Sequence, residues 1–248
     1  MQTHSNRTID VGERMFFTTM GLATLFVVFA GFATSYYLRP LTGATHYAGG
    51  QPITENYSLL IHTHAFLFSS WVVLFITQTS LVARHRTTTH RRLGLIAMGL
   101  VPAMVLTGIA VAFQGARDGW NPGGAYRDAL AFMIVGLADL VVFSACVSAG
   151  LWYRRRPDVH KRLMLLGTAG GLLWAAITRM PVVAGPFLPM FLVLSTLVLA
   201  PAARDWWMLA RTRWLSLGVG LAILLSLPAR RMIGNSQAWR DLAAWLIR

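Results

Sequence analysis

The chain has 248 residues, of which 55% are hydrophobic and only 12% are charged, and its mean hydropathy is +0.54. Soluble domains carry about 25% charged residues, so this composition excludes an ordinary soluble domain and predicts an all-α integral membrane protein. The net charge of +13 comes from Lys and Arg residues that lie between apolar stretches, which excludes a nucleic-acid-binding face and favours loops at the surface of a lipid bilayer. A single cysteine, Cys146, excludes a disulfide framework.

Seven apolar stretches predict one transmembrane domain over residues 1–248. The first, Met15–Leu38, has 24 residues without a formal charge. At about 1.5 Å per residue, this is enough to cross a hydrocarbon core about 30 Å thick. Pro186 and Pro189 are expected to kink or break the sixth stretch near its start. The tail, 235–248, is expected to form a short interfacial helix. The expected spans are 15–38, 57–83, 93–113, 129–153, 163–178, 181–200 and 214–227.

Basic residues are divided unequally between alternate loops. The loops after the first, third and fifth spans hold only four basic residues, Arg39, Arg117, Arg127 and Arg179. Because cytoplasmic loops carry the excess of Lys and Arg, we expect a multi-pass protein of a bacterial inner membrane with a cytoplasmic N-terminus and an external C-terminus. The loops after the second, fourth and sixth spans hold Arg84, Arg86, Arg91, Arg92, Arg154, Arg155, Arg156, Lys161, Arg162, Arg204, Arg211 and Arg213.

A basic motif occurs twice, with an offset of 70 residues. Residues 86–93 read RTTTHRRL and residues 156–163 read RPDVHKRL, and each copy opens an apolar stretch. The match predicts that spans two and three and spans four and five are duplicated helix hairpins. Because both hairpins begin on the same side, the repeats should be parallel, with His90 equivalent to His160.

Two histidines lie early in the second span, in the segment IHTHAFLF. His62 and His64 are two positions apart, and such side chains point about 200° apart on a helix, so they do not readily chelate one ion and a metal site at this pair is the less favoured prediction. One of them should face the interior of the bundle. His64 shares a stripe with Trp71 and Gln78 at spacings of seven. The structural alternative is that both histidines only pack and hydrogen-bond within the bundle.

Asp139 is the only acidic residue inside an expected span. A lone carboxylate in hydrocarbon needs a proton or a partner, and Arg179 is the nearest cation expected on the outer side. We therefore expect His64, Asp139 and Arg179 to form one polar pocket in the outer half of the bundle. The alternatives are a structural hydrogen bond at Asp139 and an Arg179 side chain that snorkels to the membrane surface.

His90 and His160 permit two interpretations. Each is flanked by cations at the start of a helix, as in a structural motif at the membrane boundary. As equivalent imidazoles at one depth, they are also suited to be the two axial ligands of a b-type haem whose propionates pair with the basic neighbours. A haem ligated by His64 or His62 is a further alternative.

Three segments carry a resemblance to known proteins. The motif R-x3-H-[KR]-R-L, the H-x-H-A of the second span and the tail SLPARRMIGNSQAWRDLAAWL resemble an uncharacterised family of bacterial polytopic membrane proteins. More loosely, the helix-starting histidines are similar to those of cytochrome b561-type proteins, in which paired histidines on neighbouring helices ligate haem b for electron transfer across the membrane. That resemblance implies a redox function. The fourth span departs from the b561 pattern, because it has no histidine to partner His62 or His64.

Three functions follow from these features. The first is a transmembrane redox protein that binds a b-type haem. The second is a proton- or anion-linked small-molecule carrier that uses the polar pocket. The third is an accessory subunit that acts in a homo-oligomer or beside another membrane protein. No feature of the sequence decides among them.

Overall fold

A computed structural model describes residues 2–48, 50–53, 56–121, 126–184, 186–209 and 214–248. Within these ranges the chain is helical, and its isolated β-bridge pairs His46 with Pro52 in the loop before the third helix. The expected all-α class is confirmed. Two of the basic loop residues, Arg211 and Arg213, lie outside the described ranges.

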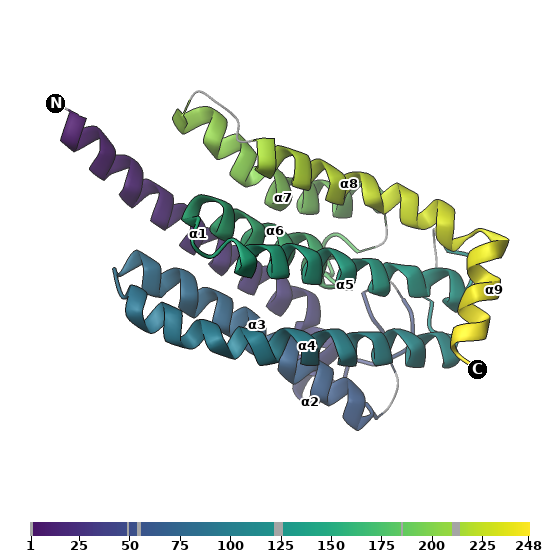
Figure 1. Ribbon diagram of the computed structural model, residues 1–248. Helices are drawn as coiled ribbons and strands as arrows, with labels where there is room; N and C mark the ends of the chain where they lie inside the picture. Colours follow the sequence, from purple (N-terminus) through teal and green to yellow (C-terminus); the bar gives the residue numbers. More distant parts are fainter. Residues whose placement is uncertain (1, 49, 54–55, 122–125, 185, 210–213) are drawn as a thin grey trace.

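The long helices run side by side, and α9 lies across one end of them (Figure 1). We call this end of the bundle the α9 end, and the opposite end the His90 end, because His90 lies in the first turn of α4. The elements in chain order are α1 (Gln2–Phe32), a π-helical continuation η1 (Ala33–Tyr37), α2 (Arg39–Thr42), α3 (Leu59–Ala83), α4 (Thr87–Arg117), α5 (Ala129–Trp152), α6 (Pro157–Ile177), α7 (Phe187–Leu209), α8 (Trp214–Gly234) and α9 (Gln237–Leu246).

Among the described residues, six helices are long and apolar enough to cross a membrane, which supports a bilayer environment. This is one fewer than the seven expected from the sequence. The difference lies in α6, whose first turns carry His160, Lys161 and Arg162. The six spans are Gly12–Tyr37, Leu59–Ala83, Thr87–Arg117, Ala129–Trp152, Phe187–Met208 and Trp214–Gly234.

Prolines explain the late start of α7. The sixth stretch was expected to begin at 181, but α7 begins only at Phe187, directly after Pro186. A helix that began at 181 would carry Pro186 in its interior, where proline removes a hydrogen bond and clashes with the preceding turn, whereas Pro189 is tolerated because the first turn of a helix has free N–H groups. The end of α8 also differs, because this helix continues to Gly234, beyond the expected end at Leu227.

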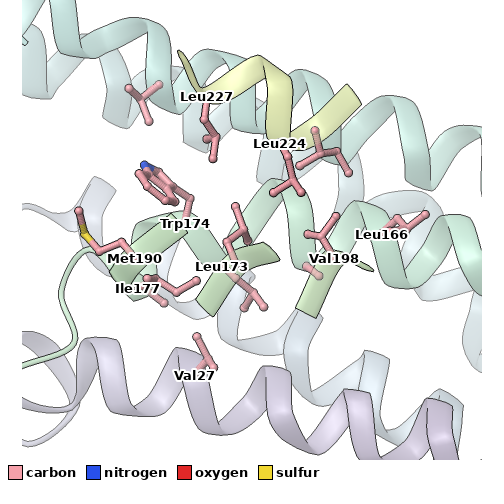
Figure 2. Packing of buried hydrophobic residues seen from close by; sticks show 14 of the residues in the cluster. Val27, Leu166, Leu173, Trp174, Ile177, Met190, Val198, Leu224 and Leu227 are labelled. Atoms are coloured by element: carbon pink, nitrogen blue, oxygen red, sulfur yellow. The ribbon is translucent and has the colours of Figure 1, made fainter. Parts of the chain in front are cut away.

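The centre of the bundle is α6, which contacts α1, α5, α7 and α8. From Arg162 to Ile177, every residue except Met164 and Ala175 is buried. Figure 2 shows Leu173 and Ile177 among side chains from α1, α7 and α8. A helix that other helices shield from lipid can carry charged residues that a lipid-facing span cannot, and this is consistent with the charged first turns of α6.

A buried ion pair joins α6 to α7 at the His90 end. Arg162 donates from Nε to Asp205 Oδ2 at 3.2 Å and from Nη2 to Asp205 Oδ1 at 2.6 Å. Its Nη1 donates to the Asp158 carbonyl at 2.9 Å. Glu13 of α1 contacts Lys161 at 2.8 Å, so α1 joins the same network. Because these charges are paired and hydrogen-bonded, the cost of burying them in the core is offset.

The C-terminal tail forms the expected helix and packs on the start of α5. Ser236 caps α9 by accepting a hydrogen bond from the Trp239 N–H at 3.3 Å. The Trp239 indole donates to the Leu130 carbonyl at 2.9 Å, and Arg240 pairs with Asp128 at 2.8 Å. These contacts close the α9 end of the bundle.

Substitution of Gly171 by Ala should destabilise the protein. A Cβ at this position of α6 would lie 2.6 Å from Phe143 Cβ and 2.7 Å from Phe143 N, and the backbone of α5 cannot yield as a side chain can. Overpacking of this kind costs about 1–3 kcal/mol, so the temperature of thermal unfolding in detergent should fall. The matched control is Gly99→Ala in α4, where no atom lies within 4 Å. Equal unfolding temperatures for the two variants would contradict this packing.

Candidate functional site

A cavity of about 810 Å³ lies at the α9 end of the bundle, between α1, α3, α4, α5 and the end of α6. This volume is in the range of about 300–1,000 Å³ typical of small-molecule pockets. Aromatic rings dominate its wall: Phe32, Tyr36, Tyr37, Tyr47, Tyr57, Phe68, Trp120, Phe132 and Trp174. Its charged or titratable lining residues other than tyrosine are His64, Asp118, Asp139 and Arg179.

Arg179 places a cation in this aromatic wall. It follows the end of α6, and its Nη1 donates to the Ala175 carbonyl at 2.7 Å. The guanidinium carbon lies 5.3 Å from the ring centroid of Phe32, 5.5 Å from that of Tyr47 and 5.1 Å from that of Trp120. Among the described residues, no carboxylate lies within 4.0 Å of it. Burial lowers the pKa of Arg179. The side chain is thus a half-buried cation held by π faces.

The hydroxyl groups of Tyr47 and Tyr57 lie near the guanidinium of Arg179 and interact with it electrostatically. Tyr57 donates to the Ser35 carbonyl at 2.8 Å, and its hydroxyl lies 3.4 Å from that of Tyr47. Burial, followed by the hydrogen bond to Tyr47, raises the pKa of Tyr57. Tyr57 therefore stays protonated at neutral pH, as a hydrogen-bonding group and not as a counter-ion.

The two histidines of α3 face different surroundings, as their spacing predicts. His64 lines the cavity and stacks on Phe68, with ring centroids 4.0 Å apart. Its Nδ1 is buried and has no hydrogen-bond partner within the described structure. His62 instead meets the Tyr36 hydroxyl at 2.9 Å on an exposed surface. The described residues contain no group of three or more His, Cys, Asp and Glu side chains that could hold a metal ion, and a metal site at this pair stays a prediction.

Asp139 lines the same cavity, but its counter-ion is not the one expected. The carboxylate accepts a hydrogen bond from Nη1 of Arg230, on α8. Both side chains are buried, with exposed fractions of 7% for Asp139 and 3% for Arg230. Arg179, the expected partner, lines the cavity without pairing to Asp139. Arg230 was overlooked because the seventh span was expected to stop at Leu227, whereas α8 carries its helix past that residue.

Trp71 and Gln78 are not part of the cavity lining. Trp71 donates from Nε1 to Thr168 Oγ1 at 3.2 Å, and Gln78 donates to the His90 carbonyl at 3.1 Å. A spacing of seven drifts by only about 20° around the helix, but it moves a side chain about 10 Å along the axis. Depth therefore separates Trp71 and Gln78 from His64, and Gln78 contacts the His90 end.

His90 and His160 meet at the end of the bundle opposite the cavity. Their ring centroids are 6.2 Å apart with an angle of 81° between the rings. Nδ1 of His160 is hydrogen-bonded to the Gly150 carbonyl at 2.8 Å, which leaves Nε2 free for another partner. Nδ1 of His90 is buried and unpartnered within the described structure. The equivalence expected from the repeated motif therefore corresponds to a direct contact between the two rings.

Comparison with protein-family models, curated proteins and solved structures finds no match. The assignment of a function therefore depends on the geometry of this chain alone.

Sequence reasoning missed the aromatic part of the site. Tyr47 and Tyr57 lie in the loop before α3, and Trp120 follows α4. Aromatic residues in such loops are typical of the membrane interface, and this interpretation concealed their position around Arg179. An available signal was the concentration of aromatic residues in the two loops on the side of Arg179.

Replacement of Arg230 by Gln should destabilise the protein far more than replacement of its neighbour Arg231. Arg230→Gln leaves a buried carboxylate at Asp139 without its cation, a defect that costs about 3–5 kcal/mol. Arg231 is exposed, so Arg231→Gln should change stability by less than about 0.5 kcal/mol. Chemical unfolding in detergent measures both. Adding Asp139→Asn to Arg230→Gln should restore part of the loss, and failure of the double variant to do so would contradict the pairing.

Proposed function

We propose that this chain is a membrane carrier that binds a small organic anion with an apolar body in the cavity at Arg179. The observation that carries this proposal is the guanidinium of Arg179, a half-buried cation that lines a cavity and has no carboxylate partner within the described structure.

Electrostatics favours an anionic ligand at this position. Each aromatic face stabilises a cation by about 0.5–2 kcal/mol, which offsets only part of the cost of burying a charge. The planar guanidinium of Arg179 suits a carboxylate or sulfonate group, which it can bind through two parallel hydrogen bonds. The hydroxyl of Tyr57 and the imidazole of His64 add polar groups that can fix the orientation of such a ligand.

The remainder of the wall favours an apolar body on the same ligand. Rings of Phe32, Phe68, Phe132 and Trp174 also line the cavity. Aromatic side chains offer large apolar contact areas, and burial of a ligand against them contributes about 25 cal/mol per Å². A small amphipathic anion satisfies both parts of the cavity, whereas an inorganic anion satisfies only Arg179.

A break in the helical structure next to the site supports a carrier. α6 ends at Ile177, Arg179 follows, and α7 begins at Phe187 after Pro181 and Pro186. Transporters commonly bind substrates where a helix is interrupted, because the interrupted segment can move and offers polar backbone groups. The described part of this connection, 178–184, is the moving element of the proposed carrier.

Membrane orientation is part of the proposal. We infer that α6 makes a seventh crossing, that α3–α4 and α5–α6 are duplicated hairpins, and that the excess of arginine at the His90 end faces the bacterial cytoplasm. The repeated basic motif and the contact between His90 and His160 support the duplication. The cavity would then open toward the outside of the inner membrane.

Reporter fusions test this orientation. A reporter that is active only outside the cytoplasm should be active when it is fused after Trp120, at the α9 end, and inactive when it is fused after Arg156, at the His90 end. The opposite pattern would reverse the orientation, and activity at both positions would contradict an odd number of crossings between them.

Replacement of Arg179 by Gln should abolish most anion binding. Naphthalene sulfonate is a suitable probe, because it has an apolar body and an ionised head group. Equilibrium dialysis with purified protein should show at least a tenfold loss of affinity, equivalent to about 1.4 kcal/mol. The matched control is Arg127→Gln, an exposed arginine at the same end of the bundle, which should bind as the parent protein does. Unchanged binding by Arg179→Gln would contradict the proposed site.

A second candidate function is transmembrane electron transfer by a b-type haem. The observation that favours it is the proximity of His90 and His160, combined with the hydrogen bond from His160 Nδ1 to Gly150, which leaves Nε2 free as a metal ligand should be. These two residues would hold the haem, which supplies one-electron chemistry. Purified protein should then show a Soret band that His160→Gln removes. A protein without a Soret band would contradict this second function and leave the carrier untouched.

A further inference from the structure

Two buried arginine–aspartate pairs occur in the described structure, and they differ in how completely they are satisfied. At the His90 end, Arg162 makes two hydrogen bonds to Asp205 and one to a carbonyl. At the α9 end, Arg230 makes one hydrogen bond to Asp139, while its Nε and Nη2 are buried and unpartnered in the described part of the chain. Fully satisfied pairs are structural, whereas buried donors without acceptors are rare and call for an explanation.

The two aspartates also differ in what they face. Asp205 is only 1% exposed and contacts α6. Asp139 is 7% exposed and lines the cavity that contains Arg179. A proton or a ligand in the cavity can therefore reach the carboxylate of Asp139 without disrupting the helix packing.

We propose that Asp139 is the proton-binding group of the anion cavity, and that proton uptake by its carboxylate raises the affinity of the cavity for an organic anion. This inference rests on the proposed carrier function and names its coupling ion.

Charge conservation gives the direction of the coupling. With Asp139 ionised, the group formed by Asp139, Arg230 and Arg179 has a net charge of +1. When the carboxylate takes up one proton, its ion pair with Arg230 is lost and the net charge becomes +2. An anion then meets a more positive site, and by linkage the bound anion favours the protonated carboxyl. One proton and one monovalent anion enter together, so the loaded cavity returns to +1.

Other ionisable groups near Asp139 have to be considered as the source of any pH dependence. α8 contributes Arg230, α3 contributes His64 across the cavity, and the end of α4 contributes Asp118 at the cavity wall. Tyr126, before α5, interacts electrostatically with both Asp139 and Arg230, while Arg179 follows α6. On α9, Arg240 is already paired with Asp128. His64 is the principal competitor, because an imidazole also gains positive charge as the pH falls.

The parent protein provides the first test. Naphthalene sulfonate keeps its charge across the pH range used, so any pH dependence of its binding belongs to the protein. In weak buffer with a pH indicator, addition of the sulfonate should cause net uptake of protons, with a maximum of about half a proton per bound anion for a tenfold coupling, because the slope of log affinity against pH equals the number of protons taken up. Affinity should rise about tenfold as the pH falls from about 8 to about 5. Binding without proton uptake would overturn the inference and leave the proposed anion site intact, whereas no binding at any pH would overturn both.

Variants then assign the proton. Asp139→Asn has the shape of the protonated carboxyl without its titration, and it should bind the sulfonate tightly at every pH with no proton uptake. The matched control is Asp241→Asn, an exposed carboxylate of α9, which should keep the pH dependence. The double variant Asp139→Asn/Arg230→Gln should show no pH dependence. It should bind the sulfonate more weakly than Asp139→Asn does, because it lacks the guanidinium of Arg230. Loss of the pH dependence in His64→Gln, with its retention in Asp139→Asn, would overturn the assignment.

Discussion

A charged side chain in the interior of a membrane protein requires a counter-charge or a polar cavity, because an isolated ion there costs several kcal/mol. Three arginines of this bundle meet that requirement in different ways. Arg162 pairs with Asp205 and joins α6 to α7, and Arg230 pairs with Asp139 and joins α8 to α5. Arg179 instead makes cation–π contacts with aromatic rings and lines the cavity. Of these three arginines, Arg179 has no carboxylate partner in the described structure, and it is the one that lines the cavity.

The two ends of the bundle therefore have different physical characters. At the His90 end, charges are closely paired and join α6 to α7 and α1. At the α9 end the helices enclose a cavity, and α9 packs over the start of α5. One end held by ion pairs and one end with a cavity, joined by one buried helix, suit a protein that binds a ligand on one side of a membrane.

Periodicity and composition predicted the helices well, because apolar length is a direct requirement of the bilayer. They predicted His64, Asp139 and Arg179, which line one cavity, because ionisable residues in apolar segments are conspicuous. They did not predict that Arg230 pairs with Asp139, since pairing between distant helices depends on packing that no local pattern records. Tyr47 and Trp120 were missed because an aromatic residue in a loop has the same local sequence pattern at a membrane interface and in a binding site.

The most direct test of this account is an experimental structure determined with naphthalene sulfonate at acidic pH. The account predicts the sulfonate oxygens at about 2.7–2.9 Å from the guanidinium of Arg179, the naphthalene ring among the aromatic side chains of the cavity, and Asp139 separated from Arg230. Sulfonate bound elsewhere, with the cavity filled by side chains around Arg179, would contradict it.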